Sequence, residues 1–291
     1  MATLQTNDRI PTSGQLLIEM LEKRWEKYLA ELKRCRAEFS NEAVHDVRVA
    51  LRRLLSLIRL LNSISPRPRL RKLSRALKDQ LDEFDDLRDT QVMLAEIGET
   101  IKELPQLKGF QDHLEKAEKR LLKKLRKDVR NIDLKEVTRR VRKMQEMLKE
   151  EEKDDLAGPI LQSVDDAFLV VRQRHERIDP AQPATIHRVR VAFKNFRYML
   201  EIAHPLLKDF PLDNLKRMHD YQSMMGETQD AEVFIQTLAD FDASSSALEP
   251  VRRHYELRRT DAVSAYLKDK DMLDDFWRSS SEVNFPWEKT K

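Results

Sequence analysis

The sequence is poor in glycine and has a single cysteine. Five glycines in 291 residues, together with many Leu, Lys, Arg and Glu, are typical of long solvated helices. Cys35 has no second cysteine with which to form an internal disulfide. No run approaches the roughly 20 apolar residues of a membrane span. The first residues, MATLQTNDRI, lack the basic and apolar segments of a secretory signal. We therefore expect a soluble cytoplasmic protein that does not insert into a membrane.

Alternation of apolar and polar residues with a period of two is also missing, so we predict no β-strand anywhere. Apolar residues recur instead every three or four positions, and 36% of the residues are charged. Prolines and polar clusters divide this pattern into helical lengths. The predicted breaks lie at 11–14, 65–68, 104–105, 131–133, 158–159, 179–183, 210–211, 242–246 and 286. The sequence therefore predicts an all-α protein.

The charges are unevenly distributed along the chain. The net charge is only +3, but residues 45–75 contain nine Lys or Arg and one acid, Asp46. Residues 145–166 show the opposite balance, with eight acids against two lysines. Local fields, more than the total charge, should therefore decide what the protein binds.

Two rows of residues define the predicted helix at 44–61. Its core row has apolar residues spaced three and four apart, at Val44, Val47, Leu51, Leu54, Ile58 and Leu61. Its basic row is turned by about 100° from the core row. That row consists of His45, Arg48, Arg52 and Arg59, with Arg53 beside it.

The same design recurs in the second half of the chain. HDVRVALR at 45–52 matches HRVRVAFK at 187–194 with five identities in eight, at an offset of 142 residues. DDLRDTQV, ending at Val92, matches GETQDAEV, ending at Val233, so that Asp89 pairs with Asp230. The second core row is Ile186, Val189, Phe193, Phe196 and Leu200, and the second basic row is His187, Arg190, Lys194 and Arg197. We predict an internal duplication: two helical bundles about a pseudo-two-fold axis, joined near Gly158-Pro159.

The basic rows differ from an ordinary solvated helix face. Such a face usually mixes signs through Glu to Lys pairs four residues apart, whereas the row at 45–59 contains no acid. Like charges three, four and seven residues apart repel one another. A bound polyanion would supply the missing negative charge, and this is the function that the pattern favours.

The paired motifs resemble those of the CHAD family, the conserved-histidine α-helical domains. The first is H-x-x-R-V-x-x-R-R from His45, and the second is H-x-x-R-V-x-x-K-x-x-R-Y from His187, followed by Glu201. The third is G-x-x-x-D-x-x-V from Gly226. The resemblance covers about residues 12–280. It implies two four-helix bundles and binding of inorganic polyphosphate in a basic channel between them. From the residues themselves we expect no cofactor and no metal ligand.

Most residues of the predicted site follow from the resemblance. Arg59 is added from the basic row of the first helix, and Arg75 and Lys216 are added because they match at the offset of the second repeat. The predicted polyphosphate-binding residues are His45, Arg48, Arg52, Arg53, Arg59, Arg75, His187, Arg190, Lys194, Arg197, Tyr198 and Lys216. The corresponding domain is a single CHAD domain at 12–280, with halves at about 12–156 and 157–280 and a tail at 281–291. No E-x-E-x-K motif of a CYTH domain precedes it, so we expect no fused catalytic domain. Association with polyphosphate granules is a further expectation.

The sequence departs from the family pattern at three positions. Position 85 is Asp where the family usually has Gly, and position 195 is Asn where the first half has Arg53. Leu55 stands at the position that matches Arg197. We therefore expect the two halves to contribute unequally to the site.

Other functions stay open at this stage. Nucleic acid is the second candidate, because a basic groove binds any polyanion, although Tyr198 is the only aromatic residue placed to stack on a base. A metal site of His45, His187 and His219 has no H-E-x-x-H or C-x-x-C motif to support it. A phosphohydrolase would need a nucleophile or a metal pair beside the cations, so we expect a binding module and not an enzyme. Self-association through the acidic stretch 145–166 is the structural alternative.

Overall fold

The computed structural model describes residues 12–132, 134–150, 155–242 and 245–288. Within these ranges the chain forms ten α-helices and several 3₁₀ turns, and no strand occurs. The helices are α1 Ser13–Glu38, α2 Asn41–Ile64, α3 Pro68–Asp82, α4 Asp85–Thr100, α5 Lys108–Arg130, α6 Leu134–Glu150, α7 Ala157–His175, α8 Pro183–Ala203, α9 Asp213–Asp242 and α10 Glu249–Asp269. The all-α prediction is confirmed.

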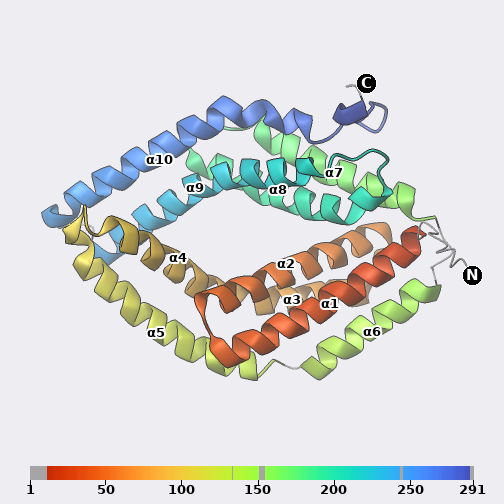
Figure 1. Cartoon of the computed structure of the whole chain (residues 1–291), viewed down its shortest axis with the longest axis horizontal. Helices are drawn as coiled ribbons and strands as arrows, with labels where there is room; N and C mark the ends of the chain where they lie inside the picture. The colour runs from red at the N-terminus through yellow and green to blue at the C-terminus, as the bar shows by residue number, and fades with distance from the viewer. Residues whose placement is uncertain (1–11, 133, 151–154, 243–244, 289–291) are drawn as a thin grey trace, which may run out of the picture.

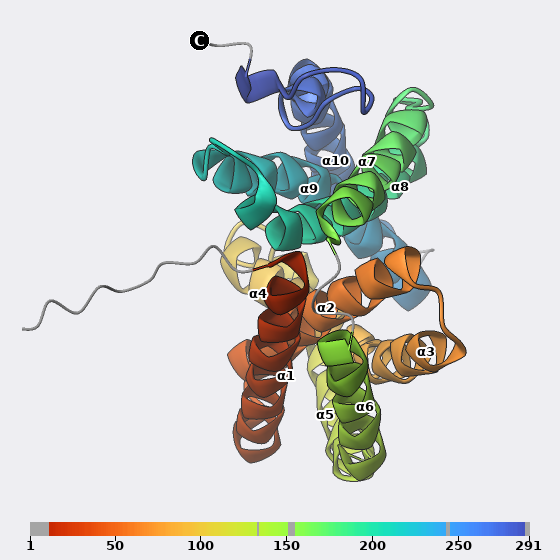
Figure 2. The ribbon, with the colours of Figure 1, turned by 90° about the vertical axis from the view of Figure 1, so that its right-hand side faces the viewer.

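The helices lie in two groups that follow the order of the chain. Helices α1 to α6 form the lower group in Figure 1, and α7 to α10 form the upper group. The two groups meet where α2 contacts α7 and α8. A second meeting point lies at the other end of the molecule, where α4 and α5 approach α9 and α10 (Figure 1). Seen along the molecule, α1, α3, α5 and α6 lie below α7 to α10 (Figure 2). The helices with the basic rows, α2 and α8, therefore lie at the boundary between the groups.

Local chemistry accounts for the starts of four helices. Thr12 and Gln15 form a capping box at the start of α1. The Ser40 hydroxyl accepts a hydrogen bond from the Ala43 amide and caps α2. Pro68 and Pro183 occupy the first turns of α3 and α8, where the missing amide proton costs nothing.

The predicted breaks agree with the helix ends at most places, with three differences. Gly158 and Pro159 lie inside the first turn of α7 and do not interrupt a helix there. Phe39, with φ of 50°, ends α1 in the left-handed region without a glycine or proline signal. Glu83 and Phe84 separate α3 from α4, again without such a signal. The break expected at 11–14 begins outside the described residues.

The order of helices in the two groups agrees with the sequence repeat. At the offset of about 142, α1 and α2 match α7 and α8, the pair α3 and α4 matches the single long helix α9, and α5 matches α10. Helix α6 has no counterpart among the described helices of the second group. The pseudo-two-fold relation between the groups stays a prediction.

Two hydrophobic cores lie inside the molecule, and both are built from residues of each group. The larger core contains the full core rows of α2 and α8, from Val44 to Leu61 and from Ile186 to Leu200, each residue at most 3% exposed. The smaller core joins Phe110 of α5 to Phe234 of α9, with ring centroids 5.5 Å apart. The predicted core rows are therefore confirmed. In the part of the chain that the structure describes, no helix combines the length and apolar character needed to cross a bilayer.

Candidate functional site

The basic rows of α2 and α8 approach each other across the boundary between the two groups. Arg48 and Arg52 come from α2, and Arg190 and Lys194 come from α8. The charges of Arg52, Arg190 and Arg48 all act on the Lys194 ammonium group. We call these four residues the central cluster. Two helices more than a hundred residues apart in the chain thus place four cations together.

The central cluster is crowded and partly removed from water. The pKa of Lys194 is lowered to about 7. Burial is the largest cause, and the positive charges of Arg52 and Arg190 are the next. Burial also lowers the pKa of Arg48 to about 10, with Arg52 as the next cause. Since these like charges repel one another, an anion placed among them would relieve the repulsion.

The first half supplies one counter-ion to this cluster. Asp85, at the start of α4, accepts a hydrogen bond from Arg48 at 2.5 Å between Oδ1 and Nη2. The Arg48 side chain is 6% exposed and the Asp85 side chain 42% exposed. The expectation that only a ligand neutralises the basic row is therefore wrong for Arg48, because a carboxylate from another helix does so.

The second half has no such counter-ion at the matching position. Gly226 of α9 matches Asp85, and the Arg190 guanidinium lies against it, with Nε 3.6 Å from the place of a Cβ. Among the described residues Arg190 forms no ion pair, although the charge of Asp230 acts on it from a greater distance, and its Nε is buried without a hydrogen-bond partner there. The two halves thus differ at equivalent positions, as the departure at position 85 predicted.

Two further aspartates lie at the edge of the central cluster. The charge of Arg190 acts on Asp230 of α9, and the charge of Asp89 of α4 acts on it more weakly, across the two groups. Both residues are exposed at the surface, but partial burial of their carboxyl groups raises the pKa of each. The positive charge of Arg48 opposes this shift at Asp89, and that of Arg190 opposes it at Asp230. These acids limit how much negative charge a ligand can bring to that edge.

The two motif histidines have neighbours at matching positions. Burial and then the charge of Arg88 lower the pKa of His45. Burial and then Arg190 lower the pKa of His187, and a hydrogen bond with Gln229 opposes this shift. Positions 88 and 229 match at the second offset. Both rings are therefore neutral at pH 7 in the empty protein and have an N–H group to donate to an anion.

A second group of predicted residues lies farther along α2 and α8, around Glu201. The Glu201 carboxylate forms ion pairs with Arg53, at 3.5 Å, and with Arg197, at 3.4 Å. Arg197 also donates to Gln222 and covers the ring of Tyr198, with 4.9 Å from its guanidinium carbon to the ring centroid. Tyr198 is 8% exposed, so its ring is not a free platform for stacking on a base.

Three predicted residues lie away from the central cluster. Arg59 and Arg75 line a separate groove of about 370 Å³ between α2 and α3. Lys216 is exposed near the start of α9, and no described contact links it to the other predicted residues. The structure thus brings together four of the predicted residues at the centre and three around Glu201.

Several residues near the site were not predicted from the sequence. Arg24 of α1 donates to the Arg53 carbonyl oxygen at 2.5 Å, and burial lowers its pKa to about 10. Arg24 belongs to neither motif, so no sequence pattern indicated it. Arg88 and Asp85 lie within the matched segment DDLRDTQV, and their difference from Gln229 and Gly226 was the available signal. Among the described residues, no group of three or more His, Cys, Asp or Glu is placed to hold a metal ion.

The fold and the paired basic helices define a class of all-α proteins with a cationic site between two helical groups. The family model of the CHAD domain matches residues 19–239, well over half of the chain. The chain therefore belongs to the CHAD domain family.

Two solved structures share the fold. The CHAD domain from the plant Ricinus communis has a TM-score of 0.65 and 20% identity, covering 91% of this chain and 90% of that one. PptA from Streptomyces chartreusis has a TM-score of 0.54 and 16% identity, covering 90% of this chain and 99% of that one. No curated protein matches the sequence significantly. At these identities the likeness shows the fold.

Proposed function

We propose that this protein binds long-chain inorganic polyphosphate between α2 and α8, and that it is a binding module and not an enzyme. The observation that supports this most directly is the central cluster, in which Arg48, Arg52, Arg190 and Lys194 converge from both halves. Polyphosphate has about one negative charge per phosphate and offers only oxygen acceptors. Arginine can bind such oxygens in a bidentate manner, and lysine serves as a point charge.

The composition of the site favours polyphosphate over nucleic acid. Single-strand binding usually depends on exposed aromatic side chains that stack on bases. Phe193 and Phe196 are fully buried in the core, and Tyr198 is covered by Arg197. A chain of phosphates needs no stacking surface, so the cations and the histidine N–H groups suffice for it.

The proposal is tested by calorimetric titration of the wild-type protein with three ligands at two salt concentrations. The ligands are long-chain polyphosphate, single-stranded DNA of equal total charge, and tripolyphosphate. We expect polyphosphate to bind at least tenfold more tightly than the DNA, with affinity that falls as salt rises. Equal affinity for DNA would show a generic basic surface instead, and absence of polyphosphate binding would overturn the proposal.

Polyphosphate affinity should also rise as the pH falls from 9 to 6. Lys194 has a pKa of about 7 in the empty protein, so it is largely neutral at pH 9 and binding must protonate it. Measuring proton uptake by calorimetry at pH 8, in buffers of different ionisation enthalpy, checks this.

The control for the pH prediction is Lys194→Arg, since arginine keeps its charge throughout this range. The variant should bind polyphosphate with little dependence on pH between 7 and 9. A wild-type affinity that is constant from pH 9 to pH 6, or a variant with an unchanged pH profile, would contradict the role given to Lys194.

A further inference from the structure

The groove between α2 and α3 is lined by cations without any carboxylate. Its lining residues are Arg59, Asn62, Ser63, Arg71, Ser74, Arg75 and Lys78. Three of the four cations, Arg59, Arg71 and Arg75, are exposed and form no ion pair with a described residue, whereas Lys78 pairs with Asp82. The hydroxyl and amide groups of Ser74 and Asn62 add neutral donors. The groove therefore offers donors and positive charge throughout.

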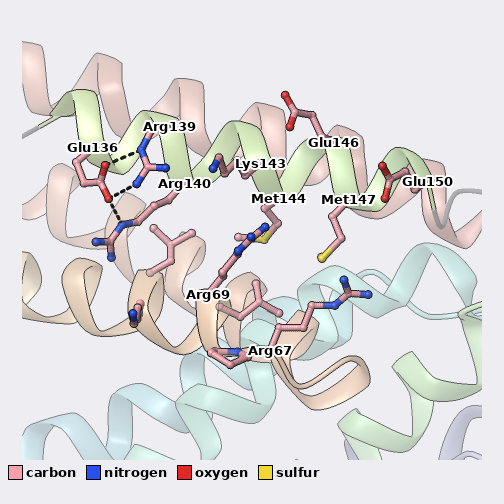
Figure 3. Close-up of a pocket in the computed structure, with 14 residues that line it drawn as sticks. Arg67, Arg69, Glu136, Arg139, Arg140, Lys143, Met144, Glu146, Met147 and Glu150 are labelled. Carbon is pink, nitrogen blue, oxygen red and sulfur yellow. Dashed lines mark hydrogen bonds and ion pairs between the residues drawn. The ribbon is translucent and has the colours of Figure 1, made fainter.

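A larger groove on the other side of α3 serves as a comparison, because its cations are accompanied by acidic side chains of the protein. It lies between α3 and α6, has a volume of about 790 Å³, and contains Glu136, Glu146 and Glu150 among its cations (Figure 3). Glu136 bridges Arg139 and Arg140, at 2.6 and 2.8 Å. The α2–α3 groove has no such acids, so its positive charge is left for an external anion.

The position of the α2–α3 groove connects it to the central cluster. Arg59 belongs to the same row of α2 as Arg52, seven residues and two turns farther on, which is about 10.5 Å along the helix. Ser63, beside Arg59 in the groove, contacts Ser163 of α7 at 2.9 Å between the two hydroxyl oxygens. The groove thus starts where the two groups meet, at the end of the row that leads from the central cluster.

We propose that the α2–α3 groove is a second contact site for the same polyphosphate chain, reached only by chains long enough to extend along α2 from the central cluster. This inference rests on the proposed function and gives its preference for long chains a structural cause. A chain already held at the centre meets the groove at high effective concentration, so three exposed arginines can raise its affinity substantially. A triphosphate bound at the centre cannot reach them.

The test compares two triple variants with equal loss of charge. The first is Arg59→Gln, Arg71→Gln, Arg75→Gln. The control is Lys123→Gln, Lys127→Gln, Arg130→Gln on α5, whose exposed cations line another groove without carboxylates but outside the α2 and α8 rows. Long-chain polyphosphate and tripolyphosphate are titrated against both variants and the wild type.

We expect the first variant to bind the long chain about tenfold more weakly and tripolyphosphate as the wild type does. The control should change neither affinity by more than about twofold. Equal losses for both ligands, an equal loss in the control, or an unchanged long-chain affinity would overturn the second site. These outcomes differ from a wild type that binds neither ligand, which would overturn the proposed function itself. All six substituted side chains are exposed, so unchanged thermal unfolding is expected.

Discussion

Replacing Arg52 and Lys194 together by alanine should weaken polyphosphate binding at least 100-fold. The two residues come from α2 and α8, so the variant removes one central cation from each half. A charge-assisted hydrogen bond contributes roughly 1.5 to 3 kcal/mol, and the loss of two therefore corresponds to a factor of 100 or more. The measurement is calorimetric titration with long-chain polyphosphate at fixed pH and salt.

The same variant should keep or gain stability, which separates a binding role from a structural one. The positive charges of Arg52, Lys194 and Arg48 repel one another. Removal of Arg52 and Lys194 therefore relieves repulsion in the protein without ligand. We expect a melting temperature equal to or higher than that of the wild type. The matched control is Lys123→Ala, Lys127→Ala on α5. A double variant that melts lower, or that still binds polyphosphate as the wild type does, would contradict this assignment.

Replacing Asp85 by asparagine should strengthen polyphosphate binding about tenfold. Asp85 forms an ion pair with Arg48, so a ligand must compete with this carboxylate for the guanidinium group. A hydrogen bond to a charged group contributes roughly 1.5 to 3 kcal/mol, and the partial exposure of Asp85 favours the lower part of that range. Titration of the variant under the conditions used for the wild type measures the gain.

The stability of this variant should change in the opposite direction. Arg48 is buried, and the loss of its carboxylate partner leaves a charged group poorly compensated, at a cost of roughly 1 to 3 kcal/mol. Added polyphosphate should then raise the melting temperature of the variant more than that of the wild type. Asp86→Asn is the control, because Asp86 is the exposed neighbour of Asp85 in the first turn of α4. An equal gain in affinity in this control would show a general charge effect and remove the specific role of Asp85.

The fold and the rows of the site could be predicted from local sequence because they depend on helical periodicity. Val44 and Ile58 of α2, and Ile186 and Phe193 of α8, are all fully buried, as their spacing predicted. The basic rows lie beside these core rows for the same geometric reason. The helix face on which a side chain lies was therefore predictable wherever the spacing of apolar residues determines the buried face.

The partners of the cations were not predictable, because they depend on packing between distant helices. Asp85 reaches Arg48 from the start of α4, and Glu201 reaches Arg53 from α8. Nothing in the periodicity of α2 indicates either contact. Arg59 and Arg52 look alike in sequence, yet the packing of α3 beside α2 places Arg59 in a separate groove. Tertiary contacts thus divide one basic row into regions with different surroundings.

The two shared hydrophobic cores have a consequence for the shape of ligand that the proposed site admits. Residues of both groups pack in each core, at the α2–α8 boundary and around Phe110 and Phe234. The spacing of the basic rows cannot widen unless these packed side chains separate, which would expose apolar surface to water. If polyphosphate binds between the rows, a fixed spacing favours a single extended strand over thicker anions of equal charge. On the proposed function, the protein thereby sorts its ligands by cross-section as well as by charge density.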